Sequence, residues 1–313
     1  MEGLHLIFDG TNTAYRANVV TNLSTKQGFR TSAIVGTLNI VHATAEYLSK
    51  QYDLPIKEII LAWDKGHSAR RKELFPEYKA GRRKGWTPED EQFRKEFFEQ
   101  IDVLHSNLHW FGIKSLMVDH WEGDDLIFGM VETLYKTCPK DLSIIVSTDE
   151  DFHQLISPAV HVFSPIKKIL YTPENYSELM GFEVESYLTY KILKGDSSDS
   201  IPGISGIGES TAKSLVKKYV DIDGLFENKD ELMKSKRTAK IFTQEGLQTL
   251  NRNNKLINLR DYVDLTPVME ELSLLLEETP QVNEKRCIDF LMKYQLVDLL
   301  SKFKDWIYLF KAM

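Results

Sequence analysis

Four short apolar segments in the first half of the chain are each followed by acidic residues, and this repeated pattern constrains the fold most. The segments are 4–8, 58–63, 114–118 and 142–147, and the acids that follow them are Asp9, Asp64, Asp119 and the pair Asp149 and Asp151. Such runs are typical of buried parallel strands. Parallel strands place their carboxyl ends at one edge of a sheet, where open α/β folds bind ligands. We therefore predict an α/β fold with a central, mostly parallel sheet and a ligand site at that edge.

Helical patterns separate these segments and predict helices on both faces of the sheet. Apolar residues at 34, 38, 41, 45 and 48 predict a core-facing helix, and a shorter helix is expected from Thr13. Thr87 followed by Pro88 is a typical helix start, and it opens a long amphipathic pattern. Segments 160–163 and 168–171 predict a hairpin, and the chain becomes helical from about residue 182.

Glu122, Asp124 and Asp125 place three carboxylates within four residues. On a helix that begins near Gly123, Glu122 and Asp125 would point from one face. At roughly 6 Å and an effective dielectric of about 20, each like-charge pair costs about 3 kcal/mol. Protons or cations must therefore relieve the repulsion. Ordinary acids at a helix N-terminus, which the macrodipole favours, are an equally open explanation of these three residues alone.

Two further segments carry a chemical signal. Residues 64–84 form the most basic part of the chain. Segment 195–213 carries glycines at 203, 206 and 208, which permit tight turns before a helix. The free N–H groups of that helix would make an anion site beside Lys213 and Lys217.

Five segments, taken in order, are typical of one known family. They are Phe8-Asp9-Gly10, Asp64-Lys65-Gly66 with the run from Phe75 to Arg82, the acidic cluster at 122–125, Thr148-Asp149-Glu150-Asp151, and the run from Gly195 to Gly208. Together they resemble the 5′ nuclease or flap endonuclease superfamily, which includes phage 5′-3′ exonucleases and the N-terminal nuclease domain of bacterial DNA polymerase I. The resemblance extends from Asp9 to about Tyr219.

The resemblance implies a two-metal site for phosphodiester hydrolysis. Two Mg²⁺ ions, for which Mn²⁺ can substitute, would activate a water and stabilise the leaving oxygen, with no serine or cysteine nucleophile. Carboxylates and water are the ligands that these cations prefer. The implied metal ligands are Asp9, Asp64, Glu122, Asp124, Asp125, Asp149, Asp151, Asp196 and Asp199.

The resemblance also implies residues that act on the substrate. The expected catalytic residues are Lys79, Arg82, Asp124 and Asp149. Of these, Lys79 and Arg82 would stabilise charge on the scissile phosphate. The alternative is that these two residues belong to a solvated basic face. Tyr78 could stack on a terminal base or sit in the core. For Tyr15 and Arg16, packing and substrate contact are equally open. The full set of implied DNA contacts is Tyr15, Arg16, Arg71, Tyr78, Arg83, Gly206, Gly208, Lys213 and Lys217.

The segment from Gly203 onward resembles a helix-hairpin-helix element, which grips the duplex backbone. Some relatives bind K⁺ there, which here would lie near the carbonyls of Ile204 and Ile207. The chain departs from the family pattern at Gly81 and Ser200, where asparagine is common, and at Gly123, where alanine is usual. None of these departures removes a carboxylate.

Composition is compatible with a polyanionic partner. The net charge is −7, but 37 acids remain against 39 Lys and Arg residues when the nine implied ligands are set aside. Binding depends on where the charges lie. No apolar run approaches the roughly 20 residues of a membrane span. Cys138 and Cys287 lie far apart without metal-ligand spacing, so we expect two inert thiols in the cytoplasm.

We expect three regions: an α/β nuclease core at 1–180 with a helical arch at about 65–110, a helix-hairpin-helix lobe at 181–265, and C-terminal helices at 266–313 that pack on the core. The expected protein is a monomeric, metal-dependent 5′ nuclease that cuts 5′ flaps, digests nicks and ends 5′→3′, and removes RNA primers from RNA–DNA hybrids beside replication proteins. The alternatives are a small acidic-site ribonuclease and a non-catalytic, structure-specific DNA-binding protein.

Overall fold

A computed structural model describes residues 1–311, apart from the side chain of Arg83. Its main sheet has six strands in the order β3-β2-β1-β4-β5-β6, of which β1 to β5 are parallel and β6 is antiparallel to β5. The predicted mostly parallel sheet and its closing hairpin are therefore confirmed. The strands are β1 (Leu4–Asp9), β2 (Ile56–Trp63), β3 (Lys114–Met117), β4 (Leu142–Val146), β5 (Val160–Ser164) and β6 (Ile169–Tyr171).

The central strand β1 marks the point at which the strand order reverses. It pairs with β2 on one side and β4 on the other, so Phe8 lies between Leu61 and Val146. Ligands of open α/β sheets bind outside the carboxyl ends of the strands at such a switch point. Asp9, the last residue of β1, lies there.

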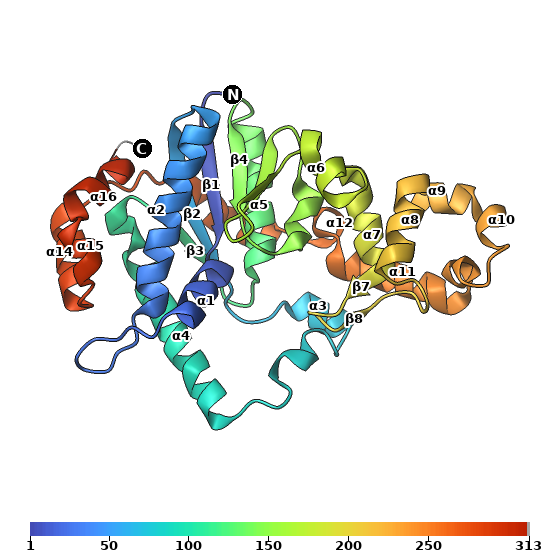
Figure 1. The fold of residues 1–313 in the computed structure, drawn as a ribbon, viewed down its shortest axis with the longest axis horizontal. Coiled ribbons are helices and arrows are strands. Elements are labelled where there is room, and N and C mark those ends of the chain that lie inside the picture. Colours follow the sequence, from blue (N-terminus) through green and yellow to red (C-terminus); the bar gives the residue numbers. More distant parts are fainter. Residues whose placement is uncertain (312–313) are drawn as a thin grey trace.

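Alternate side chains of β1 enter two separate cores. Leu4, Leu6 and Phe8 pack in one core with α2 (Ser32–Tyr52) and α4 (Pro88–Asn107). Ile7 faces the other core with α5 (Gly123–Thr137). This alternation follows from the two-residue period of a strand. The prediction of helices on both faces is confirmed, and α2 is seen lying along the sheet in Figure 1.

Capping residues determine where two of the helices begin. Thr87 and Asp90 form a capping box at the start of α4, with Pro88 at its first position, as predicted. Helix α1 (Gly10–Val20) begins earlier than the predicted start at Thr13, because the Asp9 side chain caps it by accepting from the N–H of Asn12.

The segment between β2 and β3 forms the region predicted to be an arch. The chain leaves β2 through α3 (Ala69–Leu74) and a 3₁₀ turn (Ala80–Arg83), then makes an open excursion before α4 (Figure 1). A second 3₁₀ helix (Leu108–Phe111) leads from α4 to β3.

Residues 173–262 form a mostly helical lobe at one end of the molecule (Figure 1). Its elements are α6 (Pro173–Met180), 3₁₀ (Val184–Ser186), α7 (Tyr187–Lys194), β7 (Gly195–Asp196), β8 (Ile201–Pro202), α8 (Glu209–Tyr219), α9 (Ile222–Glu227), α10 (Lys229–Leu232), 3₁₀ (Thr238–Phe242), α11 (Gln244–Ile257) and α12 (Leu259–Tyr262). Within the lobe, α7 packs on α8 and α11. In the core, a further 3₁₀ helix (Glu150–Leu155) lies between β4 and β5.

The C-terminal helices cover both faces of the sheet. After a 3₁₀ turn (Thr266–Val268), α13 (Met269–Glu277) contacts α5 and β3. The chain then reaches the opposite face, where α14 (Glu284–Lys293), α15 (Val297–Ser301) and α16 (Phe303–Lys311) join the core of α2. Among the described residues, no helix combines the length and apolar character needed to cross a membrane.

Candidate active site

Asp9 anchors the site at the end of β1. One carboxylate oxygen accepts from the N–H of Asn12 at 3.0 Å and the other from the hydroxyl of Ser147 at 2.9 Å. The Ser147 hydroxyl also accepts from the N–H of Asp149, so a serine after β4 orients two acids. Burial, reinforced by the charge of Asp64, raises the pKa of Asp9 to about 7.

Asp64 links β2 to the start of α5. Its carboxylate accepts from the N–H of Gly123 at 2.6 Å, and its own N–H donates to the hydroxyl of Thr11 at 2.8 Å. A side chain at residue 123 would lie 3.3 Å from that carboxylate, so glycine gives it room. Burial raises the pKa of Asp64.

Arg71 lies inside the acidic cluster. Its guanidinium contacts Glu122 at 2.7 Å, Asp124 at 3.2 Å and both oxygens of Asp125 at 2.8 and 2.9 Å. Glu122 and Asp125 therefore share one face, as their spacing predicts. Arg71 is only 2% exposed. The prediction that Arg71 contacts DNA finds no support in this conformation, because burial against three carboxylates leaves no surface for a phosphate.

The pKa values of the neighbouring acids Glu122 and Asp125 are shifted in opposite directions. Burial disfavours the charge of Glu122, but the ammonium of Lys79 and the guanidinium of Arg71 outweigh it and lower the pKa to about 2. Burial and the charge of Asp124 raise the pKa of Asp125 to about 7 despite Arg71. One arginine thus cannot neutralise the whole cluster.

Tyr78 and Lys79 close this half of the site. The Tyr78 hydroxyl donates to Glu122 at 2.8 Å, and the ring is 2% exposed. The prediction that Tyr78 stacks on a base likewise finds no support here; the core alternative describes its position. The ammonium of Lys79 lies 2.8 Å from Glu122 and 4.8 Å from the centre of the Tyr78 ring.

A second group of acids surrounds Lys191 of α7. Its ammonium lies 2.6 Å from Asp151 and 2.5 Å from Asp196. Burial opposes the charge of Asp196, but Lys191 and Ser198 together lower the pKa to about 2. Burial and the charge of Asp151 raise the pKa of Asp149 well above its usual range. The two groups are continuous, since Asp9 also raises the pKa of Asp149.

The base of the arch docks on the turn between β7 and β8. The N–H of Lys79 donates to the Asp199 carbonyl at 2.9 Å, and Arg82 contacts the Asp199 carboxylate at 2.5 Å. The N–H of Gly81 donates to the Ser200 hydroxyl at 3.3 Å. Two of the departures from the family pattern, Gly81 and Ser200, are therefore in contact.

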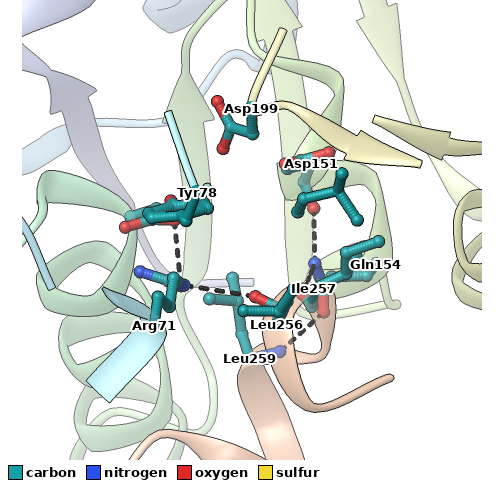
Figure 2. Close-up of a pocket in the computed structure, with 10 residues that line it drawn as sticks. Arg71, Tyr78, Asp151, Gln154, Asp199, Leu256, Ile257 and Leu259 are labelled. Atoms are coloured by element: carbon teal, nitrogen blue, oxygen red, sulfur yellow. Dashed lines mark hydrogen bonds and ion pairs between the residues drawn. The ribbon is translucent and has the colours of Figure 1, made fainter. Parts of the chain in front are cut away.

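A small cavity separates the two halves of the site (Figure 2). Arg71 and Tyr78 line one side, and Asp151 with Gln154 lines the other. Its volume is about 10 Å³, which is enough for one water molecule. The Gln154 side chain joins the core to the lobe by donating to the Ile257 carbonyl and accepting from the N–H of Leu259.

The charge balance and the donor chemistry fit divalent cations. Among the described residues, the nine predicted ligands contact four permanently cationic side chains: Arg71, Lys79, Arg82 and Lys191. Five negative charges remain uncompensated when all nine acids are ionised. Ligand oxygens of Glu122, Asp124 and Asp125 lie within 4.8 Å of one another. Carboxylate oxygens at this density suit Mg²⁺ or Mn²⁺. In contrast, Asp119 is 71% exposed and pairs with Lys65, away from the nine.

The other predicted DNA contacts lie on the surface around the site. Tyr15 is 51% exposed and meets Phe97 edge-on, while Arg16 donates from Nε to Asn12 and Thr148. Gly206 has a φ of 84° in the turn before α8, and Gly208 caps that helix. The side chain of Arg83 falls outside the described residues.

Two predictions for the segment that resembles a helix-hairpin-helix remain open, namely the DNA contacts of its lysines and the K⁺ site. Lys213 pairs with Glu209 at 3.0 Å, and Lys217 lies in the last turn of α8. The Ile204 carbonyl, a predicted K⁺ ligand together with that of Ile207, accepts from the N–H of Ile207 at 2.9 Å.

Sequence reasoning missed Lys191, Ser147 and Thr11. Lys191 stands among the apolar residues of α7 and is only 6% exposed. A lysine on the buried side of an amphipathic helix is a signal of a buried anionic partner. The two hydroxyl residues carried no comparable signal, because their role depends on the register of β1 with β2 and β4.

The sheet, the converging carboxylates and the helical lobe together fit the class of nucleases. Residues 4–181 match the family model described as 5′-3′ exonuclease, N-terminal resolvase-like domain, and residues 182–300 match the one described as 5′-3′ exonuclease, C-terminal SAM fold. The chain therefore belongs to the 5′-3′ exonuclease family.

Relatives support this membership. The chain is 28% identical over 301 residues to a 5′-3′ exonuclease of Aquifex aeolicus, covering 96% of this chain and 93% of that protein. It is 33% identical over 243 residues to DNA polymerase I of Bacillus subtilis, covering 75% of this chain and 26% of the polymerase. The chain thus spans about a quarter to a third of the polymerase relatives' length.

Solved structures show the same fold. A bacteriophage T5 flap endonuclease, in a pseudo-enzyme–product complex with DNA and metal ions, superposes with a TM-score of 0.65 at 22% identity. The superposition covers 98% of this chain and 99% of that one.

Proposed function

We propose that the chain is a metal-dependent, structure-selective 5′ nuclease that hydrolyses phosphodiester bonds with two divalent ions. The convergence of nine carboxylates from the strand ends, the start of α5 and the β7–β8 segment carries this proposal. Their charge exceeds what the described cationic side chains neutralise, and raised pKa values of Asp9 and Asp125 mark buried carboxyls that lack a sufficient cation. The activity for which the family is named, 5′-3′ exonuclease, agrees with such a site.

Each group of acids would hold one part of the metal centre. Asp9, Asp64, Glu122, Asp124 and Asp125 surround the first part, and Asp149, Asp151, Asp196 and Asp199 surround the second. When bound, Mg²⁺ or Mn²⁺ ions supply a water of lowered pKa and stabilisation for the leaving oxygen. The protein's part is to fix these carboxylates through Ser147, Gly123 and Lys191.

Lys79 and Arg82 would stabilise charge on the scissile phosphate. Both sit at the base of the arch beside the carboxylates, paired with Glu122 and Asp199. With those carboxylates engaged in metal binding, Lys79 and Arg82 would pair with them less strongly and would turn toward an entering phosphate. The same residues would therefore balance the charge of the free site and act on the bound substrate.

The substrate would be DNA with a 5′ flap, nick or end, and RNA–DNA hybrids as primers. The flap endonuclease with the same fold was solved with DNA. Here, the glycines before α8, together with Lys213 and Lys217, would hold the duplex backbone without reading its bases. K⁺ at the Ile204 and Ile207 carbonyls, a monomeric state, contact with replication proteins and a cytoplasmic site of action are part of the same proposal.

A flap assay with matched variants tests the proposal. A labelled 5′-flap duplex should release short 5′ products with Mg²⁺ or Mn²⁺ and none with chelator. Asp149→Asn should abolish cleavage, whereas Asp119→Asn, which changes an exposed acid after the edge strand β3, should leave it unchanged. Cleavage that survives chelation, or equal losses in both variants, would contradict the proposed site.

The same assay separates the alternative functions. Flap, nicked, blunt and RNA-primer substrates run side by side give the balance of endonuclease and exonuclease activity. Preferential cleavage of unpaired RNA would favour an acidic-site ribonuclease. Tight flap binding without turnover in any divalent metal would favour a non-catalytic DNA-binding protein.

A further inference from the structure

A cluster of ligand-type side chains lies at the opposite end of the sheet from the active site. His5 lies near the start of β1, while Cys138 ends α5 and Asp141 precedes β4. One ligand atom from each lies within 4.8 Å of the other two. Asp9 follows His5 by four positions along the strand, or about 13 Å, so this cluster is distinct from the nuclease site.

A short turn presents Cys138 and Asp141 to His5. The N–H of Asp141 donates to the Cys138 carbonyl at 3.0 Å and closes the turn between them. The next N–H, from Leu142, donates to the Gly3 carbonyl and aligns the turn with β1. The sequence gives no sign of this contact. His5 lies far from Cys138 and Asp141 along the chain, and the spacing of the two cysteines is not that of metal ligands.

The contacts of His5 resemble those of a metal-bound imidazole. Its Nδ1 lies 2.5 Å from the carboxylate of Glu58, its neighbour across the β1–β2 pair. Metal-ligating histidines commonly place their second nitrogen on such a carboxylate, which fixes the ring. Lys114, which lies 2.5 Å from the other oxygen of Glu58, neutralises that carboxylate. The Nε2 of His5 points to Asp141 at 3.1 Å.

Asp141 supplies the second observation that points to a ligand. One of its oxygens contacts His5, whereas the other is buried and has no hydrogen-bond partner among the described residues. An unsatisfied buried oxygen costs free energy that a bound cation would recover. Cys138 packs at the edge of the adjacent core and is partly accessible, so an ion can reach the cluster from solvent.

We propose that His5, Cys138 and Asp141 form a second metal site, specific for a zinc-class ion. Nitrogen, sulfur and oxygen ligands together suit Zn²⁺ or Co²⁺, whereas Mg²⁺ takes oxygen ligands. Tetrahedral ligands lie roughly 3 to 4 Å apart, so closure by about 1 Å brings the three atoms into range. The ligands must be a thiolate and an unprotonated Nε2, so binding displaces any proton on those two atoms. The ion would clasp β1, α5 and β4 together and leave a fourth position for water.

Cobalt spectroscopy on the full chain tests this site without using nuclease activity. Thiolate ligation of Co²⁺ gives a charge-transfer absorption that carboxylate ligation at the nuclease site cannot produce. The intensity of the absorption should correspond to one thiolate-ligated Co²⁺ per chain, and the absorption should vanish in Cys138→Ser and persist in Cys287→Ser. Glu58→Gln should weaken Co²⁺ binding about tenfold to a hundredfold, because it removes the carboxylate that orients His5.

A thiol-protection experiment on the unaltered chain removes the dependence on variants that must fold. Zn²⁺ should slow alkylation of Cys138 by iodoacetamide, measured by mass spectrometry of the Cys138 peptide. No thiolate absorption in the wild type, absorption that survives Cys138→Ser, or equal alkylation with and without Zn²⁺ would each overturn the proposal. The cluster would then be a salt-bridged histidine beside an unligated thiol.

Discussion

Lys191 of the helical lobe and Asp151 of the core lie 2.6 Å apart, and the same ammonium lies 2.5 Å from Asp196. One buried cation therefore links two acids whose positions depend on different parts of the chain. These contacts raise the pKa of Lys191 above its usual range, although burial opposes its charge. Lys191 is thus a positioning residue of the proposed metal centre.

Replacing Lys191 by methionine should destabilise the metal-free protein by about 3 to 5 kcal/mol, the usual cost of removing one partner of a buried ion pair. Mg²⁺ should restore part of the loss by supplying positive charge. Urea unfolding with and without chelator measures both effects. Lys194→Met is the matched control, since Lys194 lies on the same helix and contacts the Tyr190 ring and hydroxyl. Equally small losses of unfolding free energy in both variants would show that the charge of Lys191 does not stabilise the acids around it.

The stability of the metal-free protein should fall as the pH rises from about 4 to 7. Asp9 and Asp125 have native pKa values of about 7, above the ordinary value of 3.8, so the native state holds protons that the unfolded chain has lost. Each such carboxyl lowers the unfolding free energy by up to about 1.4 kcal/mol per pH unit within that window. Glu122 and Asp196, with pKa values of about 2, act oppositely and only below about pH 4.5.

Unfolding curves at pH 5, 6, 7 and 8 in chelator would measure this dependence. Asp9→Asn should flatten the slope, and saturating Mg²⁺ should do the same in the unaltered protein. A stability that rises across this range in chelator would show that the two carboxyls are not destabilised by burial in the native state.

Lys79→Ala should slow flap cleavage by about 10²–10³-fold while weakening flap binding much less. The ammonium of Lys79 lies beside the carboxylates of the proposed metal centre. Its charge would therefore be close to the phosphate that is cleaved. Single-turnover rates and binding measured in Ca²⁺ separate the two effects. Lys84→Ala, an exposed lysine of the same arch, provides the control. Parallel losses of rate and binding would assign Lys79 to substrate grip.

Tyr78→Phe should lower the unfolding free energy of the metal-free protein by about 1.5 to 3 kcal/mol, because it removes a hydrogen bond to the ionised Glu122. Flap binding should stay unchanged if the tyrosine is a core residue. Tyr78→Ala additionally removes the ring. A loss of flap binding in a folded Tyr78→Ala protein, with Tyr78→Phe normal, would restore the base-stacking role.

Lys217→Ala should reduce the salt slope of flap binding by about one unit, as expected for one lost phosphate contact. Lys213→Ala should have a smaller effect, since Glu209 already pairs with that lysine. Affinities at several KCl concentrations measure both slopes, with the exposed Lys136 of α5 as the control. A larger effect for Lys213 would show that its pairing with Glu209 breaks on DNA.

Much of the fold could be predicted because its signals are local. Buried strands and amphipathic helices follow from their periods, and the Thr87–Asp90 box fixes the start of α4 within four residues of sequence. The spacing of Glu122 and Asp125 likewise placed both on one face. In contrast, Asp119 shares the strand-end pattern and yet lies outside the site, because its side chain turns to Lys65 and solvent.

The sequence alone determined the α/β class, the carboxylates and the family resemblance, because each depends on residue type and spacing along the chain. Only the tertiary structure decided which cations meet those carboxylates. Arg71 joins Asp125 across 54 residues and His5 meets Asp141 across 136, and no periodicity extends that far. The physical reason is that strand register and packing determine which buried charged side chains come into contact. Both are established only when the whole sheet assembles.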